Sequence, residues 1–347
     1  MITRDESLKY RFIDFASRQS YNAGQTAKDS IDKTFDFIET RYLPEIRDAG
    51  QSSFLSNKEL KGALRHLAGL GRQVYSDFVP EHLRNSIRGL ENGSILTFIS
   101  DNIGIPWELV YNGIDFWGRR FVIHKLDTMY DLPLQPITLG YEKVLNIVGA
   151  NVQQPAKRQA LNLFRNIEGS FSDFVNIDGG KIDSIEDVYE EIADADIIHI
   201  TSHGQLDERG GLYLQIVRES RAYLNLTPAV IGVLPIKPGC LVFANACVSA
   251  GSQPGIEKSI RFGTMFCSNE KQGGAFIGTL DLIPDEPAIE FAHCFYYEYF
   301  FRGFPVGEAL RLAKGSQLAH GKTRYGLFPL VYSLYGNPFV EGVPLYE

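Results

Sequence analysis

Two short apolar runs, each followed by a reactive side chain, constrain the fold of this chain more than any other feature. Ile197–Ile200 precedes His203 and Gly204, and Leu241–Ala244 precedes the segment Asn245–Cys247. Such runs are typical of strands that are buried on both faces of a parallel sheet. Sites in open α/β sheets form at the carboxyl ends of the strands. The pattern therefore brings a histidine and a cysteine to one edge of a sheet.

The rest of the chain from residue 143 onward alternates between strand and helix patterns. We expect strands at 144–150, 174–177, 197–203, 212–214, 241–246, 275–279 and 328–334, and helices at 157–171, 184–193 and in two segments after residue 285. The helix after Asp183 has Ser184 as its N-cap. This alternation predicts an α/β fold with a mostly parallel sheet flanked by helices.

The first part of the chain has a helical pattern instead. Apolar side chains recur at Ile31, Phe35, Ile38 and Tyr42, at spacings of four, three and four. This spacing predicts an N-terminal helical segment over residues 1–57 that packs on the body of the protein. A second helical stretch covers 58–90, strand patterns follow at 94–99 and 121–123, and residues 133–140 form a linker. We therefore divide the remainder into two α/β halves, 58–135 and 136–347.

Composition narrows the classes of partner. The chain of 347 residues carries 34 basic and 42 acidic residues, a net charge of −8, and no long basic run. We expect neither nucleic acid nor an anionic membrane as a direct partner. No secretory signal is visible in the polar first residues, and the four scattered cysteines favour a reducing, cytoplasmic location. With no zinc-ligand spacing among the cysteines and histidines, we expect no metal site.

A cysteine beside a histidine can act as a nucleophile once the imidazole takes the thiol proton. In that interpretation Cys247 is the nucleophile, His203 is the base, and the N–H groups of Gly204 and Cys247 form an oxyanion hole. The alternative is a hydrogen-bonded histidine at a strand end and a small buried cysteine. We interpret Cys240, Cys267, Cys294 and His199 as packing residues, and Asp285 either as a helix N-cap or as part of the substrate cleft.

Several ordered segments resemble CHAT domains, which belong to the clan of cysteine peptidases that includes caspases, separase and gingipains. The His203-Gly204 pair and the segment 245–251 resemble the His-Gly and Asn-Ala-Cys-x-Ser-Gly motifs of that family. Further similar segments are 105–109, which resembles Leu-Pro-Trp-Glu, 275–280 with Asp285 after it, and 329–338. The resemblance covers about residues 60 to 347.

The resemblance implies a caspase-like fold in which a degenerate half, 58–135, precedes an active half, 136–347. It also implies Cys247 as nucleophile, His203 as base, no cofactor, and an S1 region formed by Asn245, Asp281 and Asp285. The chain departs from the family pattern at Ala250, where a glycine is usual, and at Asp281, where tryptophan is usual. It also lacks the tetratricopeptide repeats that often accompany these domains.

The sequence therefore favours a cysteine endopeptidase that cleaves a specific protein substrate. By analogy with the family, it acts in a bacterial antiviral defence or cell-death pathway and is switched on by a protein partner or signal. A catalytically idle caspase-like scaffold is the first alternative. A small-molecule hydrolase on a doubly wound sheet is the second, although no Gly-x-Ser-x-Gly segment supports it.

Overall fold

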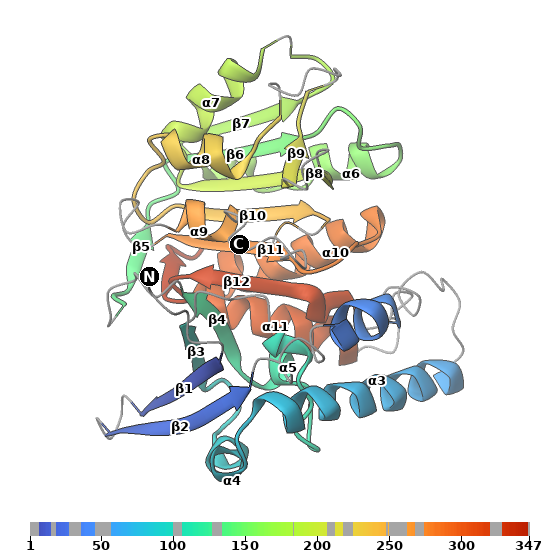
Figure 1. Ribbon diagram of the computed structural model, residues 1–347. Helices are drawn as coiled ribbons and strands as arrows, with labels where there is room; N and C mark the ends of the chain where they lie inside the picture. The colour runs from blue at the N-terminus through green and yellow to red at the C-terminus, as the bar shows by residue number, and fades with distance from the viewer. Residues whose placement is uncertain are drawn as a thin grey trace, which may run out of the picture.

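A single large sheet forms the centre of the molecule (Figure 1). The computed structural model describes residues 7–14, 19–27, 36–45, 57–99, 106–126, 134–182, 184–206, 212–217, 225–247, 249, 262–267, 274–319 and 328–345. The strands of the sheet are β3 (Ile95–Ile99), β4 (Val122–Leu126), β12 (Tyr332–Gly336), β11 (Ala275–Thr279), β10 (Leu241–Ala246), β8 (Ile197–Leu206), β6 (Lys143–Val148) and β7 (Asp173–Asp178), in that order, with β9 (Leu212–Gln215) paired to β8.

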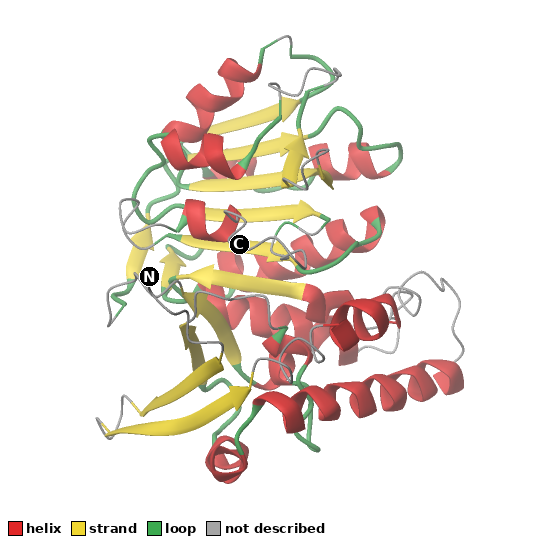
Figure 2. Ribbon diagram, in the orientation of Figure 1, coloured by secondary structure: helices red, strands yellow, loops and turns green. Residues whose placement is uncertain are grey.

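Most of the neighbouring strands run parallel. The exceptions in this sheet are β12, which pairs antiparallel with β11, and β9, which pairs antiparallel with β8. Helices flank the sheet on both sides (Figure 2). The predicted α/β class, a mostly parallel sheet flanked by helices, is confirmed.

The two faces of the sheet have separate helical layers. Phe243 of β10 packs with ring centroids 5.1 Å from Phe295 on α10 (Asp285–Tyr296). On the opposite face, Phe276 of β11 stacks at 5.4 Å on Phe266 of α9 (Phe262–Phe266). The layer with α10 also contains α6 (Ala156–Leu161) and α11 (Val306–Ala319), and α9 contacts α8 (Pro228–Val233). Since side chains alternate along a strand, every second residue of β10 faces α10.

The N-terminal prediction is wrong for residues 7–14 and 19–27. These residues form two antiparallel strands, β1 (Ser7–Asp14) and β2 (Gln19–Ala27). The physical reason lies in the alternation of Leu8, Tyr10 and Phe12 with charged residues, which has the period of a strand and not of a helix. The helical spacing seen further along does not extend back into this segment.

The helical prediction is confirmed for the described residues that follow. A helical turn, η1 (Ile38–Tyr42), lies within residues 36–45, and both Ile38 and Tyr42 are buried. The Tyr42 hydroxyl donates a hydrogen bond of 2.7 Å to the carbonyl oxygen of Leu109. Ile31 and Phe35 lie outside the described residues. This segment therefore packs on the body of the protein as expected.

Residues 57–126 follow the prediction in outline. Two helices, α3 (Asn57–Phe78) and α4 (Glu81–Gly89), precede β3. The short η2 (Trp107–Leu109) and α5 (Trp117–Arg120), which were not predicted, lie between β3 and β4. Strand β4 then pairs with β12, so the two predicted halves contribute strands to one sheet.

Three segments differ from the predicted boundaries. The linker contains β5 (Ile137–Leu139), which pairs with β13 (Val340–Gly342). The helix predicted to reach residue 171 ends at Leu161, where Asn162 is the C-cap and its side-chain amide donates to the Arg158 carbonyl. The last strand begins only at Tyr332, after η7 (Phe328–Val331), because Pro329 has no N–H for a sheet.

The other helices agree with the sequence. Helix α7 (Ile185–Ala193) has Ser184 as its N-cap, and the Ser184 hydroxyl accepts from the N–H of Glu186. Among the described residues, none of the helices combines the length and the apolar character that a membrane span requires.

Candidate active site

The register of two parallel strands brings His203 and Cys247 together. Strand β10 pairs with β8 so that Asn245 lies opposite Thr201 and Ala246 opposite Ser202. One step further along both strands, Cys247 follows β10 beside His203 of β8. His199 contacts Tyr296 of α10, so it lies on the face of the sheet that packs on this helix. Because side chains alternate along a strand, the side chains of His203 and Cys247 lie on the same face.

Strand β8 does not end at His203, as the sequence had suggested. It continues to Leu206, and its last four residues pair with β9, where His203 lies opposite Gln215. Pairing with β10 stops one residue before His203. At Gly204 the two backbones come so close that a Cβ atom would clash with the Cys247 carbonyl, so only glycine fits there.

The His203 imidazole is oriented by a backbone carbonyl. Its Nε2 lies 3.0 Å from the carbonyl oxygen of Asn151, which follows β6. A carbonyl oxygen can only accept, so Nε2 carries the hydrogen and Nδ1 has the free lone pair. A base held in this way by a third group matches the arrangement of nucleophilic enzymes. Among the hydrogen bonds of the described residues, none joins this imidazole to the Cys247 thiol.

The Cys247 thiol is half-buried and lies against a backbone carbonyl. Its Sγ lies 3.8 Å from the carbonyl oxygen of Ile283, in the segment between β11 and α10. Burial raises the pKa of the thiol, and the negative charges of Asp285 and Asp281 raise it further. The contact with the Ile283 carbonyl acts in the opposite direction, and the net effect is a pKa of the thiol above its ordinary value.

Asp281 and Asp285 lie in the segment that passes Cys247. Asp281 is buried, with 5% of its surface exposed, and Asp285 is the first residue of α10. Asp285 is not the N-cap, because that position is Pro284. An N-cap at Asp285 would accept from an N–H two or three residues later. Pro287 has no N–H, and the N–H of Ala288 donates to the Pro284 carbonyl.

Asn245 is buried and hydrogen-bonded on both sides of its amide. Its Nδ2 donates to the Ala288 carbonyl of α10 at 3.0 Å, and its Oδ1 accepts from the Tyr332 hydroxyl of β12 at 2.7 Å. The amide therefore joins three elements behind the thiol. Its role in the S1 region stays a prediction.

Two hydroxyl groups, which sequence reasoning missed, hold the turn that carries Cys247. The Thr279 hydroxyl donates to the Ala246 carbonyl at 2.7 Å, and the Thr279 N–H donates to Ser249 Oγ at 3.0 Å. Ser249 Oγ in turn donates to the Ala244 carbonyl at 3.3 Å. The signal for Ser249 was its place two residues after the cysteine. Val248 and residues 250–261, with most of the predicted loop after the cysteine, lie outside the described residues.

The remaining cysteines and His199 lie away from this pair. Cys240 and Cys267 are buried, and Cys294 is half-buried on α10. Cys267 follows α9 and does not lie within it. The His199 ring is fully buried and bonded to Tyr296 and Thr201, and burial lowers its pKa to about 3. The interpretation of His199 as a core residue is confirmed. Among the described residues, no group of histidine, cysteine and acidic side chains could hold a metal ion.

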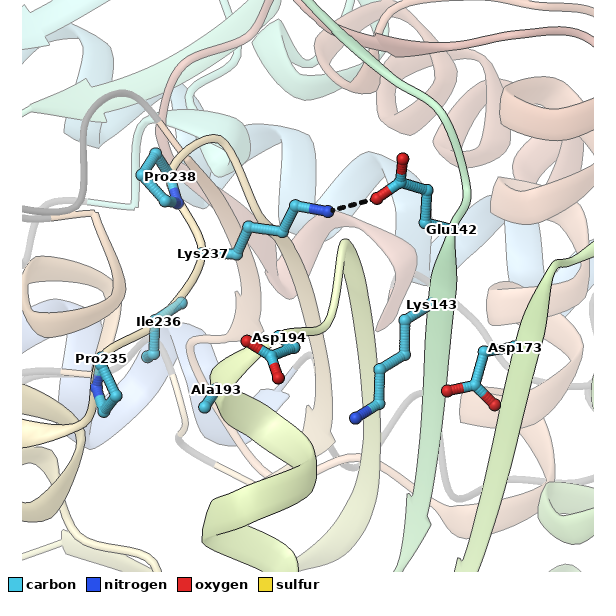
Figure 3. Close-up of a pocket in the computed structure, with 9 residues that line it drawn as sticks. All are labelled: Glu142, Lys143, Asp173, Ala193, Asp194, Pro235, Ile236, Lys237 and Pro238. Carbon is cyan, nitrogen blue, oxygen red and sulfur yellow. Dashed lines mark hydrogen bonds and ion pairs between the residues drawn. The ribbon is translucent and has the colours of Figure 1, made fainter.

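A cavity of about 790 Å³ lies where strands β6 and β7 begin, at the amino ends of these strands (Figure 3). Lys143 and Asp173, the first residues of β6 and β7, line it together with Pro235–Pro238. The Lys237 ammonium contacts Glu142 at 3.2 Å and Asp196 at 2.6 Å, so it is neutralised by ion pairs. Because the cavity lies at the amino ends of these strands, it is separate from the His203 and Cys247 pair.

Comparisons with known proteins give similarity in structure only. No protein-family model and no curated protein match the chain. A chain of the Saccharomyces cerevisiae separase–securin complex is similar over 72% of this chain and 16% of its own length, with 17% identity and a TM-score of 0.49. The Porphyromonas gingivalis RgpB pro- and mature-domain complex covers 88% of this chain and 77% of its own, with 9% identity and a TM-score of 0.46.

A third similar structure is that of gingipain R, described as an Arg-specific cysteine proteinase. It covers 88% of this chain and 76% of its own, with 10% identity and a TM-score of 0.42. This chain spans 16% of the separase-complex chain, so it corresponds to a small part of that protein. A function for this chain therefore has to be argued from its own site.

Proposed function

We propose that this chain is a cysteine endopeptidase of the CHAT, caspase-like type. The observation that supports the proposal is the register of β8 and β10, whose last pair, Ala246 and Ser202, directly precedes Cys247 and His203. The hydrogen bond from His203 to the Asn151 carbonyl supports it, because it leaves Nδ1 as the proton acceptor.

The proposed reaction has the following steps. Cys247 Sγ gives its proton to His203 Nδ1 and attacks the carbonyl carbon of the scissile peptide bond, forming a C–S bond. The N–H groups of Gly204 and Cys247 stabilise the oxyanion. The imidazolium then protonates the leaving amine as the C–N bond breaks. Water hydrolyses the thioester, with His203 taking the proton of the water and returning one to the sulfur.

The acidic surroundings of the thiol favour a basic P1 side chain. Asp281 and Asp285 lie close enough to Cys247 for their charges to act on its pKa. A lysine or arginine at P1 would neutralise them and relieve the repulsion that opposes a thiolate. We therefore assign Asp281 and Asp285 to the S1 region and predict preference for a cationic residue. Peptides that differ only at P1, with arginine, lysine, glutamate or alanine, test this preference.

The state of the dyad supports a protease that is switched on by a partner or signal. The thiol has a raised pKa and contacts the Ile283 carbonyl, while the imidazole is bonded to the Asn151 carbonyl. Cleavage requires the thiol proton to reach the imidazole. We propose a bacterial defence or cell-death pathway as the setting, a specific protein as substrate, and the cytoplasm as location, on the basis of the sequence resemblance.

Co-expression with neighbouring gene products tests the protease directly. The chain, Cys247→Ala and the matched control Cys294→Ala are each co-expressed with the proteins encoded beside it, and intact masses are measured. A fragment should form with the chain and with Cys294→Ala, and its formation should fall about a thousandfold or more with Cys247→Ala. If the same fragment also forms with Cys247→Ala, the proposed nucleophile is wrong. If none forms even under the native trigger, an idle scaffold is favoured.

A further inference from the structure

Asn245 connects the nucleophile strand to the segment that carries the acidic residues. It lies two residues before Cys247, so its side chain points to the same face of the sheet. Only 3% of Asn245 is exposed, and Tyr332 is fully buried. A buried amide with a partner at each end fixes its neighbours in one arrangement, because breaking either bond leaves an unpaired polar group.

The bond to α10 acts near the start of that helix. Ala288, whose carbonyl accepts from Asn245, lies one turn after Asp285. The carbonyl of Ile283, just before the helix, contacts the Cys247 sulfur at 3.8 Å. The position of this segment relative to the thiol therefore depends on how α10 is held against β10.

Tyr332 of β12 is a second link between Asn245 and helix α10. Its ring stacks on Phe291 of α10, with centroids 4.0 Å apart, and its hydroxyl donates to Asn245. Burial raises the pKa of Tyr332, and the charge of Cys247 raises it further, which puts the hydroxyl within electrostatic reach of the sulfur. Tyr332 thus contacts both the helix and the amide behind the nucleophile.

We propose that Asn245 and Tyr332 are positioning residues that hold the start of α10, with Asp281 and Asp285, beside Cys247. They thereby set how strongly the site discriminates among P1 side chains. The part that concerns P1 rests on the proposed function. The part that concerns the placement of the carboxylates beside the thiol does not.

The pH dependence of Cys247 alkylation tests this placement without any substrate. Iodoacetamide labelling of Cys247 is followed by mass spectrometry in the full chain, in Tyr332→Phe and in the matched control Tyr296→Phe. The control removes another buried tyrosine hydroxyl at the same sheet–helix interface, which contacts His199 at 3.1 Å. We expect the pH midpoint of labelling to fall in Tyr332→Phe, because the carboxylates are no longer held near the sulfur, and to stay constant in Tyr296→Phe.

A double-mutant comparison shows whether Tyr332 acts through the carboxylates. In an Asp285→Asn background, Tyr332→Phe should shift the midpoint much less than it does in the natural chain. Asn245→Leu provides a second variant that removes the same connection. A purely structural role predicts equal effects of Tyr332→Phe with and without Asp285, or equal effects of Tyr332→Phe and Tyr296→Phe. Either result overturns the proposal.

Cleavage of peptides separates this proposal from the proposed function. The ratio of kcat/KM for P1 arginine over P1 alanine should fall by roughly tenfold in Tyr332→Phe and in Asn245→Leu, as expected for coupled neighbours. If the natural chain cleaves nothing even under its native trigger but the labelling midpoint still shifts, the protease proposal fails and the positioning stands. If the chain cleaves with arginine preference and neither variant changes the ratio or the midpoint, the positioning is wrong and the protease stands.

Discussion

At the scale of single residues, the charges beside Cys247 oppose the ionisation of its thiol. Asp285 raises the pKa of the thiol more than Asp281 does. Replacing Asp285 by asparagine removes one negative charge, so the pKa of Cys247 should fall and its thiolate fraction at neutral pH should rise. We expect iodoacetamide to label Cys247 severalfold faster in Asp285→Asn than in the natural chain, measured by peptide mass spectrometry at pH 7.

The neighbouring Glu286 supplies the matched control. It carries the same charge, is exposed in the first turn of α10, and is not among the groups that act on the Cys247 pKa. Glu286→Gln should leave the labelling rate unchanged. An equal acceleration in both variants would mean that the net charge of the region, and not the place of Asp285, controls the thiol.

At the scale of elements, three buried charged side chains meet where β4, η2 and α11 pack together. Glu108 lies with its Oε2 3.4 Å from Lys125 Nζ, and its charge also acts on Lys314. Two lysines thus share one carboxylate, which leaves an excess positive charge in the interior. Lys314→Met should stabilise the protein by ~1–3 kcal/mol at pH 7, whereas Glu108→Gln should destabilise it by ~3–5 kcal/mol, since it leaves two buried cations unpaired.

The pH dependence of stability gives this prediction a definite sign. Burial lowers the pKa of Lys314 to about 8, below its ordinary value of 10.5 in the unfolded chain. Between these values the unfolded chain binds more protons, so the free energy of unfolding should rise with pH from about 8 to 10.5. Urea denaturation of the natural chain and of Lys314→Met at pH 7, 8.5 and 10 measures this rise. A rise of equal size in Lys314→Met would contradict the assignment to Lys314.

The elements also show what a sequence can and cannot predict. Strand β10 is buried along its whole length and begins with four apolar residues, so its position and the cysteine after it could be found from the sequence pattern alone. The pairing of residues 7–14 with 19–27 was not predicted, because the alternation that marks these strands is short and the helical spacing that follows is stronger. Short strands such as Ile137–Leu139 carry too few residues for a periodic signal and depend on a partner about 200 residues away.

The candidate site divides in the same way. His203 and Cys247 could be predicted because side chains of distinctive chemistry follow two apolar runs. The orienting group of His203 is the backbone carbonyl of Asn151. Every residue type has such a carbonyl, so the sequence alone cannot indicate this contact. The partner of Asn245 is a tyrosine 87 positions later, and only the folded sheet brings the two together. Long-range contacts of this kind require the three-dimensional structure.

At the scale of the whole molecule, the predicted halves are joined through the interior. His124 Nδ1 lies 2.9 Å from the Gly336 carbonyl, and the Ser333 hydroxyl donates to Glu108 at 2.6 Å. Strand β4 also pairs with β12. Because buried polar bonds and a shared sheet cross the boundary at residue 135, we expect residues 58–135 and 136–347 to unfold together in one cooperative transition.

The natural fluorophores and thiols of the chain can test this cooperativity. Both tryptophans, Trp107 and Trp117, lie in the first half, while the buried Cys240 and Cys267 lie in the second. Tryptophan fluorescence and thiol accessibility should therefore give the same urea midpoint. Ser333→Ala leaves the buried Glu108 oxygen without this donor, so it should lower both midpoints together, at a cost of about 1–3 kcal/mol. Separate midpoints for the two probes, or a shift confined to one of them, would mean that the halves unfold independently, and that the shared sheet does not couple the fold of the first half to the cysteine site of the second.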